Sequence, residues 1–452
     1  MNILALAYLF PPDSGSGTYR SLYFLNHLVN FGDEVTVITA KEEDFAPGTN
    51  LDYELQSIVS NRIRVVRASV IRPVERLLRL RDTLKRFAGR RVPSAREKLP
   101  HSSGSRRSWT QSIKDTITDV LTCPDEHVGW IPDAIRQAGR VMRSTSIDCI
   151  YATGGPWSAL VAGALLKRKH EIPLVLDFRD PWTSNPYTKY QSALINGCGR
   201  ILESFCIRSA DFIIANTEDV REDFVRRYPN IRCERFVTIT NGFERMSPNN
   251  TQPRNQKFTL VHAGELYLSR NPANFFRAIT LLLREKRIPE NEILIRLVGG
   301  CSTAGETGSI LETEVLKHVV EITPRVSHSI ALQYQMMADA LLIFQTGFPL
   351  QIPRKLYEYM SLRKPVLAIT EPKSATARVV EESKVGIVAD QSVEAITDAV
   401  SRLYELWKTG MDMTVSTEHV ARYQNDRLAS ELQVVLRNAS SSLLRGRSAT
   451  SA

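Results

Sequence analysis

A lysine and a glutamate one helical turn apart lie where a phosphate-bearing ligand would be expected to bind. In LIFQTGFPLQIPRKLYEYMSLRKPVLAIT, an apolar run ends at Thr346, a helix begins after Pro353, and a second apolar run follows. Ligands of parallel sheets lie at the carboxyl ends of strands, opposite helix N-termini. Lys355 and Glu358 share one face of this helix. A cation for a diphosphate beside a carboxylate for ribose hydroxyls predicts a nucleotide-sugar site.

The alternative for Lys355 and Glu358 is a surface salt bridge, worth under about 1 kcal/mol. Their position between two apolar runs, behind a proline-bearing loop, favours the ligand site. Gly347, Phe348 and Leu356 belong to the same loop and helix. We therefore expect them to contact the donor as well.

A glycine-rich loop follows the first apolar run of the chain. Gly15, Ser16 and Gly17 lie between this run and a helical pattern, where glycine lets backbone amides approach a phosphate or sugar. The third glycine of the dinucleotide fingerprint is absent, and the second expected strand ends at Thr39-Ala40 without an acidic residue. Both departures argue against NAD binding. The alternative interpretation of the loop is a plain tight turn.

The segment DFRDPW carries two carboxylates and an arginine at the end of an expected strand. Asp177, Arg179 and Asp180 are predicted to contact a polar substrate there. The alternative is a salt-bridged turn that caps the next helix. No Asp-x-Asp occurs in the chain, so a metal-bridged diphosphate of that kind is not indicated.

Two further loops supply candidates. The loop GELYLSRN begins at Gly264, which we expect to contact the donor. It also contains Arg270, which we expect to be a second diphosphate cation rather than a solvated loop arginine. Asn241 ends a strand before a polar connector, and it is either a cleft residue or part of an ordinary turn.

The elements that position these residues alternate between apolar runs and helical patterns. This alternation predicts an α/β fold with two Rossmann-like, doubly wound parallel sheets facing a cleft. We expect an N-terminal acceptor domain, a C-terminal nucleotide-sugar domain, a last helix that crosses back to the N-terminal domain, and a disordered tail. Their predicted ranges are 1–244, 257–415, 416–440 and 441–452.

Composition excludes several other classes of protein. The 452 residues are enough for two domains, and no apolar run approaches the roughly 20 residues of a membrane span. The start MNILALAYLF resembles a buried strand more than a signal peptide, which predicts a cytoplasmic protein. The cysteines and histidines show no ligand spacing, so we expect no metal.

A basic insert at about 72–110 holds most of the excess charge. Between Arg72 and Arg107 it carries twelve Lys or Arg and three acidic residues, which accounts for the net charge of +9. A nucleic-acid-binding protein would spread basic residues over its folded domains, so we expect no nucleic acid partner. The segment 73–87 has apolar residues on one side and arginines around them. It is expected either to dock on an anionic inner-membrane surface or to pack on the sheet with its charges solvated.

Together, the motifs resemble family 4 glycosyltransferases with the GT-B fold. The segment IPRKLYEYMSLRKPVLAI resembles their nucleotide-sugar segment. FPPDSGSGTYR, PDEHVGWIPDAI, DFRDPWTSNPY and ITNGF resemble the branch that makes bacterial surface polysaccharides. The resemblance covers nearly the whole chain in order, apart from the basic insert and the tail.

The resemblance implies retaining transfer of a sugar from a nucleotide-diphosphate donor to a lipid-linked or polysaccharide acceptor, without cofactor or essential metal. Glu358 would hold the ribose, and Arg270 and Lys355 would stabilise the leaving diphosphate. Gly15 and Gly17 would form the cleft floor. The departing phosphate would help to remove the acceptor proton.

Two departures from the family pattern leave alternatives open. Leu350 stands where the broader family has a second glutamate, so the donor sugar is undefined, and Arg179-Asp180 stands where His-Asp is common. A sugar-nucleotide 2-epimerase and a catalytically inactive, sugar-nucleotide-binding subunit remain the competing interpretations. The sequence indicates neither the nucleobase nor the linkage.

Overall fold

The structure is a computed structural model. It describes residues 1–46, 48–71, 122–185, 193–245, 255–266, 271–299, 301, 306–411 and 415–449. The chain divides into two compact units. The first comprises Met1–Ala215, Arg227–Val237 and Leu432–Ala452, and the second comprises Asn216–Arg226 and Thr238–Glu431. The chain therefore passes between the units after Ala215, Arg226, Val237 and Glu431.

The first unit is built on a seven-stranded sheet in the order β3-β2-β1-β4-β5-β6-β7. Its strands are β1 (Asn2–Ala7), β2 (Glu34–Ala40), β3 (Arg64–Ala68), β4 (Cys149–Gly154), β5 (Leu174–Phe178), β6 (Phe212–Ala215) and β7 (Phe236–Thr238). The pairs from β3 to β6 are parallel. β4 and β5 are buried along their whole length, as expected where helices cover both faces of a parallel sheet.

Helices connect these strands. They are α1 (Ser16–Asn30), α2 (Tyr53–Ile58), α5 (Ile131–Ser144), α6 (Ser158–His170) and α7 (Ala193–Ser209). The helix between β6 and β7, α8 (Glu218–Arg227), belongs to the second unit except for Arg227. The strand order reverses between β1 and β4, and because these strands are parallel, the loops that follow them leave from the same, carboxyl end of the sheet. In a doubly wound sheet this switch point is the expected place for a ligand.

The second unit has a six-stranded parallel sheet in the order β10-β9-β8-β11-β12-β13. Its strands are β8 (Phe258–Ala263), β9 (Ile293–Val298), β10 (Val320–Thr323), β11 (Ala340–Gln345), β12 (Val366–Thr370) and β13 (Gly386–Ala389). The order reverses between β8 and β11, which places a second switch point there. The two parallel sheets confirm the predicted fold class.

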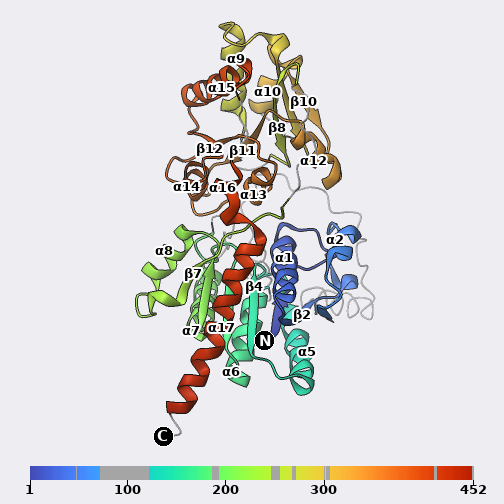
Figure 1. The fold of residues 1–452 in the computed structure, drawn as a ribbon, viewed down its shortest axis with the longest axis vertical. Coiled ribbons are helices and arrows are strands. Elements are labelled where there is room, and N and C mark those ends of the chain that lie inside the picture. Colours follow the sequence, from blue (N-terminus) through green and yellow to red (C-terminus); the bar gives the residue numbers. More distant parts are fainter. Residues whose placement is uncertain are drawn as a thin grey trace, which may run out of the picture. The chain divides into compact units, whose positions relative to one another are not determined.

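The helices of the second unit are α9 (Ala273–Arg284), α10 (Glu306–Leu311), α11 (Glu314–Lys317), α12 (His328–Met336), α13 (Arg354–Ser361), α14 (Ala375–Glu382), α15 (Val393–Lys408) and α16 (Thr417–Val420). The last helix, α17 (Asn425–Ala449), begins in the second unit and belongs to the first unit after Glu431. α9 and α15 lie side by side and pack on one sheet face through Phe275 and Tyr404 (Figure 1). The other face is covered by α13 and α14, through residues such as Tyr357 and Val380. Apolar side chains are therefore buried on both faces of the sheet, and α13 begins directly after Pro353.

Some predicted element bounds need correction. The last helix was expected over 416–440 with a disordered tail after it, but α17 runs from Asn425 to Ala449. No proline interrupts this stretch, and each added residue extends the helix by one hydrogen bond, so the helix continues. Gln433 of α17 donates to Asp33 at 2.6 Å, which ties the helix to the first unit.

Other sequence features cannot be followed in the structure. The basic insert and Arg270 lie outside the described residues.

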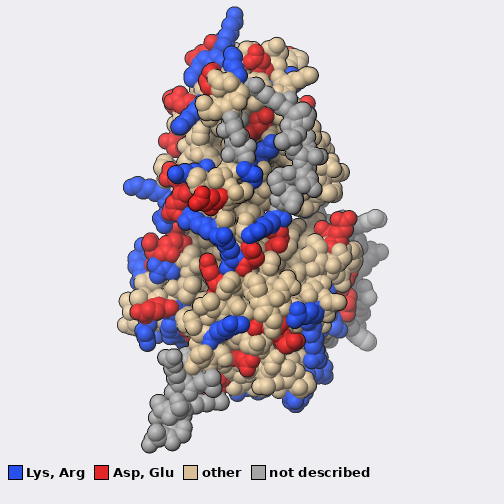
Figure 2. All heavy atoms as spheres, viewed as in Figure 1, with Lys and Arg blue, Asp and Glu red and all other residues tan. Residues whose placement is uncertain are grey.

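Within the described ranges, no helix is long and apolar enough to cross a membrane. The same ranges hold no group of three or more His, Cys, Asp and Glu arranged to bind a metal ion. Figure 2 shows Lys and Arg interspersed with Asp and Glu on the face in view.

Candidate functional site

Lys355 lies against Gly264 at the carboxyl end of β8. A β-carbon added to Gly264 would come within 1.8 Å of Lys355 Nζ, so the absence of a side chain at Gly264 makes room for the ammonium group. Gly264 also has a φ of +120°, a conformation that other residues rarely adopt. The ammonium of Lys355 is thus held at the switch point of the second unit.

Two further contacts fix this arrangement. The Ala263 amide donates to the hydroxyl of Tyr359 at 3.2 Å, so a residue one turn beyond Lys355 ties α13 to the end of β8. Gly299, which follows β9, has a φ of +114° and lies close to Gly264. A β-carbon added to Gly299 would be only 2.9 Å from the Cα of Gly264. The ends of β8 and β9 and helix α13 therefore pack together where the Lys355 amine lies.

Glu358 forms its ion pair with Arg354 rather than with Lys355. Arg354 Nη2 donates to Glu358 Oε2 at 3.2 Å, and both side chains keep some solvent exposure. The ion pair that the structure shows at Glu358 is thus the one with Arg354. Lys355 faces Gly264 while Glu358 remains accessible beside Arg354, so the two can serve different parts of a ligand.

The proline-bearing loop between β11 and α13 is held by its backbone. The carbonyl of Pro349 accepts from the Ala375 amide at 2.7 Å, and that of Leu350 accepts from Thr217 Oγ1 at 2.8 Å. The carbonyl of Gln351 accepts from Thr376 Oγ1 at 3.0 Å. Three successive carbonyls are thereby fixed without a regular helix or strand. A loop of this kind is preorganised, which reduces the entropy lost on binding.

Three predicted donor contacts lie within this region. Gly347 is exposed with a φ of +81°, and its amide donates to Glu371 Oε1 at 2.7 Å. Phe348 and Leu356 are buried in the protein, and the Leu356 amide donates to the Pro353 carbonyl at 2.9 Å. The side chains of Phe348 and Leu356 thus support the loop and the helix start from within.

In the first unit, Asp13 organises the glycine-rich loop. Its buried carboxylate accepts from the Gly15 amide at 2.7 Å and from Thr18 Oγ1 at 2.9 Å. The Gly15 amide is therefore occupied within the fold, whereas Ser16, the first residue of α1, is exposed. The sequence motif contained Asp13, but its role as the anchor of the loop was not predicted.

Arg179 lies directly against Gly17. A β-carbon at Gly17 would be 1.8 Å from Arg179 Nη1, and Arg179 Nη2 also donates to the carbonyl of Gly155. Burial lowers the pKa of the Arg179 guanidinium from its usual value, while nearby Asp180 opposes the shift. The predicted loop residues Gly17 and Arg179 are thus brought together, at the switch point of the first unit.

Asp177 points into the interior and requires a correction. Its carboxylate accepts from Arg20 at 2.8 and 2.9 Å, from the Tyr151 hydroxyl at 2.6 Å and from Thr153 Oγ1 at 3.1 Å. The residue has no exposed surface. Burial and the neighbouring carboxylate raise the pKa of Tyr151 well above its usual value. Asp177 therefore holds Arg20 inside the fold, and Asp180, which is partly exposed, is the carboxylate left near the surface.

Asn241 lies in the second unit, and His127 lies in the first. The Asn241 amide donates to Asn216 Oδ1 at 2.9 Å within the second unit. His127 was not selected from the sequence, yet its ring centroid lies 4.1 Å from that of Tyr8, immediately after β1. Asp125 fixes it by accepting the His127 amide at 2.9 Å. The motif PDEHVGW was the available signal, but nothing in its spacing indicated that the histidine would lie beside β1.

Replacing Gly264 by alanine is expected to reduce turnover by about tenfold or more. The new β-carbon would displace Lys355 Nζ, and a misplaced group at a reacting centre can lower rates about a hundredfold. The positive φ adds about 1–2 kcal/mol of strain. Turnover and thermal unfolding should be measured together. Gly410→Ala, also at positive φ but after α15, is the matched control, and an equal loss of turnover in both variants would contradict this role.

Comparisons with known proteins show the family and the fold of this chain. Residues 14–242 match the family model described as glycosyl transferase 4-like domain, and residues 257–406 match that of glycosyl transferases group 1. The first match covers more than half of the chain, so the protein belongs to the glycosyl transferase 4-like family. No sequence among the curated proteins matches this chain.

Solved structures share the fold. HepE from Anabaena, solved with UDP and glucose, is 17% identical, with 97% of this chain and 100% of HepE covered at a TM-score of 0.59. The lipopolysaccharide outer core galactosyltransferase WaaB is 11% identical, with coverages of 97% and 99% and a TM-score of 0.57. A putative UDP-N-acetylglucosamine 2-epimerase from Listeria monocytogenes reaches a TM-score of 0.50 at 9% identity, covering 96% of this chain and 95% of its own. The fold is thus GT-B.

Proposed function

We propose that this glycosyltransferase transfers a sugar, with retention of configuration, from a nucleotide-diphosphate donor to a lipid-linked or polysaccharide acceptor. The reaction would belong to surface polysaccharide biosynthesis in the cytoplasm and would need neither a cofactor nor an essential metal. A peripheral contact with the inner membrane through residues 72–107 remains part of this proposal. The observation that carries it is the Lys355 ammonium held at Gly264, on the same helix as the partly exposed carboxylate of Glu358.

The proposed reaction requires that negative charge on the leaving phosphate be stabilised, and it does not require a strong general base. As the bond between sugar and diphosphate breaks, negative charge grows on the departing phosphate, and a fixed ammonium lowers the energy of that state more than that of the bound donor. Lys355 supplies this cation, with Arg270 as the proposed second one. The leaving phosphate takes the acceptor proton, and the acceptor oxygen forms the new bond to the sugar on the face that the phosphate leaves.

A panel of UDP-, GDP- and dTDP-sugars tests the reaction class. We expect slow hydrolysis of one donor, with nucleoside diphosphate and free sugar detected by mass spectrometry. An isomerised nucleotide sugar would instead identify an epimerase, and binding without turnover would identify an inactive subunit. The donor that is hydrolysed in this panel then serves as the substrate when turnover of the variants is measured.

Replacing Glu358 by alanine is expected to weaken nucleoside diphosphate binding about tenfold or more, because hydrogen bonds to a charged group contribute about 1.5–3 kcal/mol. Arg354→Met is the matched control, since it removes the ion pair on α13 and leaves the carboxylate in place. Calorimetric titration of both variants with nucleoside diphosphate distinguishes two roles of Glu358. If it contacts the ribose, only Glu358→Ala loses affinity; if it only stabilises the helix through its ion pair, both variants lose affinity alike. Equal affinities of Glu358→Ala and wild type would refute the ribose role.

A further inference from the structure

Glu203 is a buried carboxylate that the proposed reaction does not use. It lies in α7, has no exposed surface and is surrounded by donors from two segments, one at Thr183 and one at the end of α8. The Thr183 amide donates to Oε2 at 2.9 Å, and Thr183 Oγ1 lies 3.1 Å from the same atom. Arg227 Nη1 forms an ion pair with Oε1, and the Tyr228 hydroxyl donates to it at 2.7 Å.

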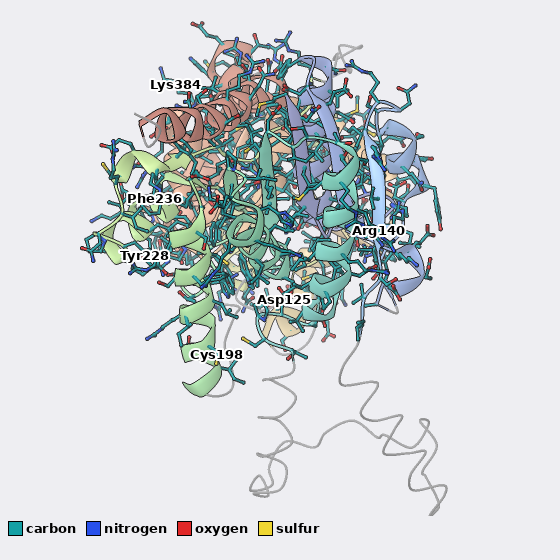
Figure 3. The ribbon with its side chains drawn as sticks, turned by 90° about the horizontal axis from the view of Figure 1, so that it is seen from below. Asp125, Arg140, Cys198, Tyr228, Phe236 and Lys384 are labelled. Atoms are coloured by element: carbon teal, nitrogen blue, oxygen red, sulfur yellow. The ribbon has the colours of Figure 1, made fainter. Side chains whose placement is uncertain are left out.

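Two side chains near Glu203 are affected by the same buried environment. Burial raises the pKa values of Tyr228 and Cys206 above their usual range, and the Glu203 carboxylate adds to both shifts. Figure 3 shows Tyr228 beside the helix that carries Cys198, which is α7. Removing a carboxylate from water is costly, and buried ion pairs often add no stability over apolar residues of similar size. Stability alone therefore gives no strong reason for a carboxylate here.

Thr183 ends the segment Arg179–Thr183, which contains the proposed site residues Arg179 and Asp180. The start of this segment is fixed by the Arg179 amide, which donates to the Gly154 carbonyl at 2.9 Å. Its middle is fixed by Trp182, which is fully buried and stacks on Trp157 with ring centroids 5.2 Å apart and planes 5° apart. Glu203 supplies the third attachment, at the carboxyl end.

We propose that Glu203 is a positioning residue for the reaction: through Thr183 it holds the Arg179–Thr183 segment, so that the partly exposed Asp180 faces the acceptor, which is water in donor hydrolysis. This inference rests on the proposed function of Asp180. A carboxylate suits the task because it binds the Thr183 amide and hydroxyl and two donors from the end of α8 together. An apolar residue would fill the space and leave the Thr183 amide unpaired at a cost.

A double-mutant cycle with Glu203→Gln and Asp180→Asn tests the proposal, using hydrolysis of the donor found in the panel. We expect Glu203→Gln to lower kcat about tenfold with the donor KM within about twofold, because the donor is bound by the second unit. Asp180→Asn should lower kcat further. Since Glu203 acts through Asp180, the double variant should match Asp180→Asn, whereas independent residues would give additive losses. Additive losses, or a wild-type kcat in Glu203→Gln, would overturn the proposal.

A second pair of variants keeps the test usable if Glu203→Gln folds poorly. Thr183→Val removes the hydroxyl contact and should lower kcat, while Thr183→Ser retains the hydroxyl and should restore it. Arg226→Gln is the matched control for Arg227→Gln, because the exposed Arg226 pairs at 2.9 Å with Asp223 and not with Glu203. Only Arg227→Gln should lower kcat, and equal losses in both would overturn the proposal.

A spectroscopic readout separates this proposal from the proposed function. The stacked Trp157 and Trp182 should give a coupled near-ultraviolet circular dichroism signal that weakens in Glu203→Gln and Thr183→Val. If wild type hydrolyses no donor, the proposed function fails while this signal still reports whether Glu203 orders the segment. An unchanged signal in both variants would contradict the positioning role.

Discussion

Replacing Lys355 by alanine is expected to lower turnover by about 10²- to 10³-fold, the usual cost of losing one preorganised group that stabilises developing charge. The amine lies against Gly264, on a helix that is tied to the strand end through Tyr359, so no other part of α13 can take its place. Because the cation acts mainly as the bond breaks, kcat should fall more than the affinity for nucleoside diphosphate. Donor hydrolysis and calorimetric binding of the diphosphate measure the two quantities.

Two further variants make this test specific. Lys355→Arg keeps the charge but brings a planar group to a space that only a glycine leaves open, so partial activity is expected. Lys373→Ala removes an exposed lysine in the turn after β12 and should leave turnover unchanged. A fall in affinity that accounts for the whole loss in Lys355→Ala would show that the amine binds the ground state only.

Replacing Asp177 by alanine is expected to destabilise the first unit by about 3–5 kcal/mol, because it leaves the buried Arg20 guanidinium without its counter-charge. The Tyr151 and Thr153 hydroxyls would lose their acceptor as well. A loss of this size corresponds to a fall of roughly 10 °C in the melting temperature of a domain of this length. Differential scanning calorimetry measures it directly.

Glu43→Gln is the control for the Asp177 variant. Glu43 forms an exposed pair with Lys41 at 3.5 Å in the same unit, and exposed pairs contribute little. Its melting temperature should equal that of wild type. If Asp177→Ala melts like wild type but loses donor hydrolysis, Asp177 would be a site residue after all, and its placement inside the fold would need another explanation.

Much of the fold could be predicted because buried parallel strands appear as apolar runs. β5 and β11 are such runs, and the glycines and prolines after them mark the loops. β10 was not predicted. Its sequence, Val-Glu-Ile-Thr, alternates at a sheet edge and is partly exposed, so it gives a weak signal. The end of α17 was placed too early because serine and arginine content resembled a tail.

The candidate site could be predicted only in part, because the type of a residue does not reveal which way its side chain points. Asp177 and Asp180 looked alike in DFRDPW, yet the alternation of β5 turns Asp177 inward toward Arg20. Gly17 and Gly264 were predicted to approach a ligand. In the structure, each approaches a cation of the protein itself, an arrangement that requires contacts between residues far apart in the sequence.

The loop between β11 and α13 depends on a residue that precedes it by more than a hundred positions, since the Leu350 carbonyl accepts its hydrogen bond from Thr217. Thr217 belongs to Asn216–Arg226, which the first half of the sequence contributes to the second unit. A chimera that exchanged only the residues after the polar connector with those of a relative would therefore separate this loop from its partner. Exchanges of donor specificity within the family should carry residues 216–226 along with the C-terminal half.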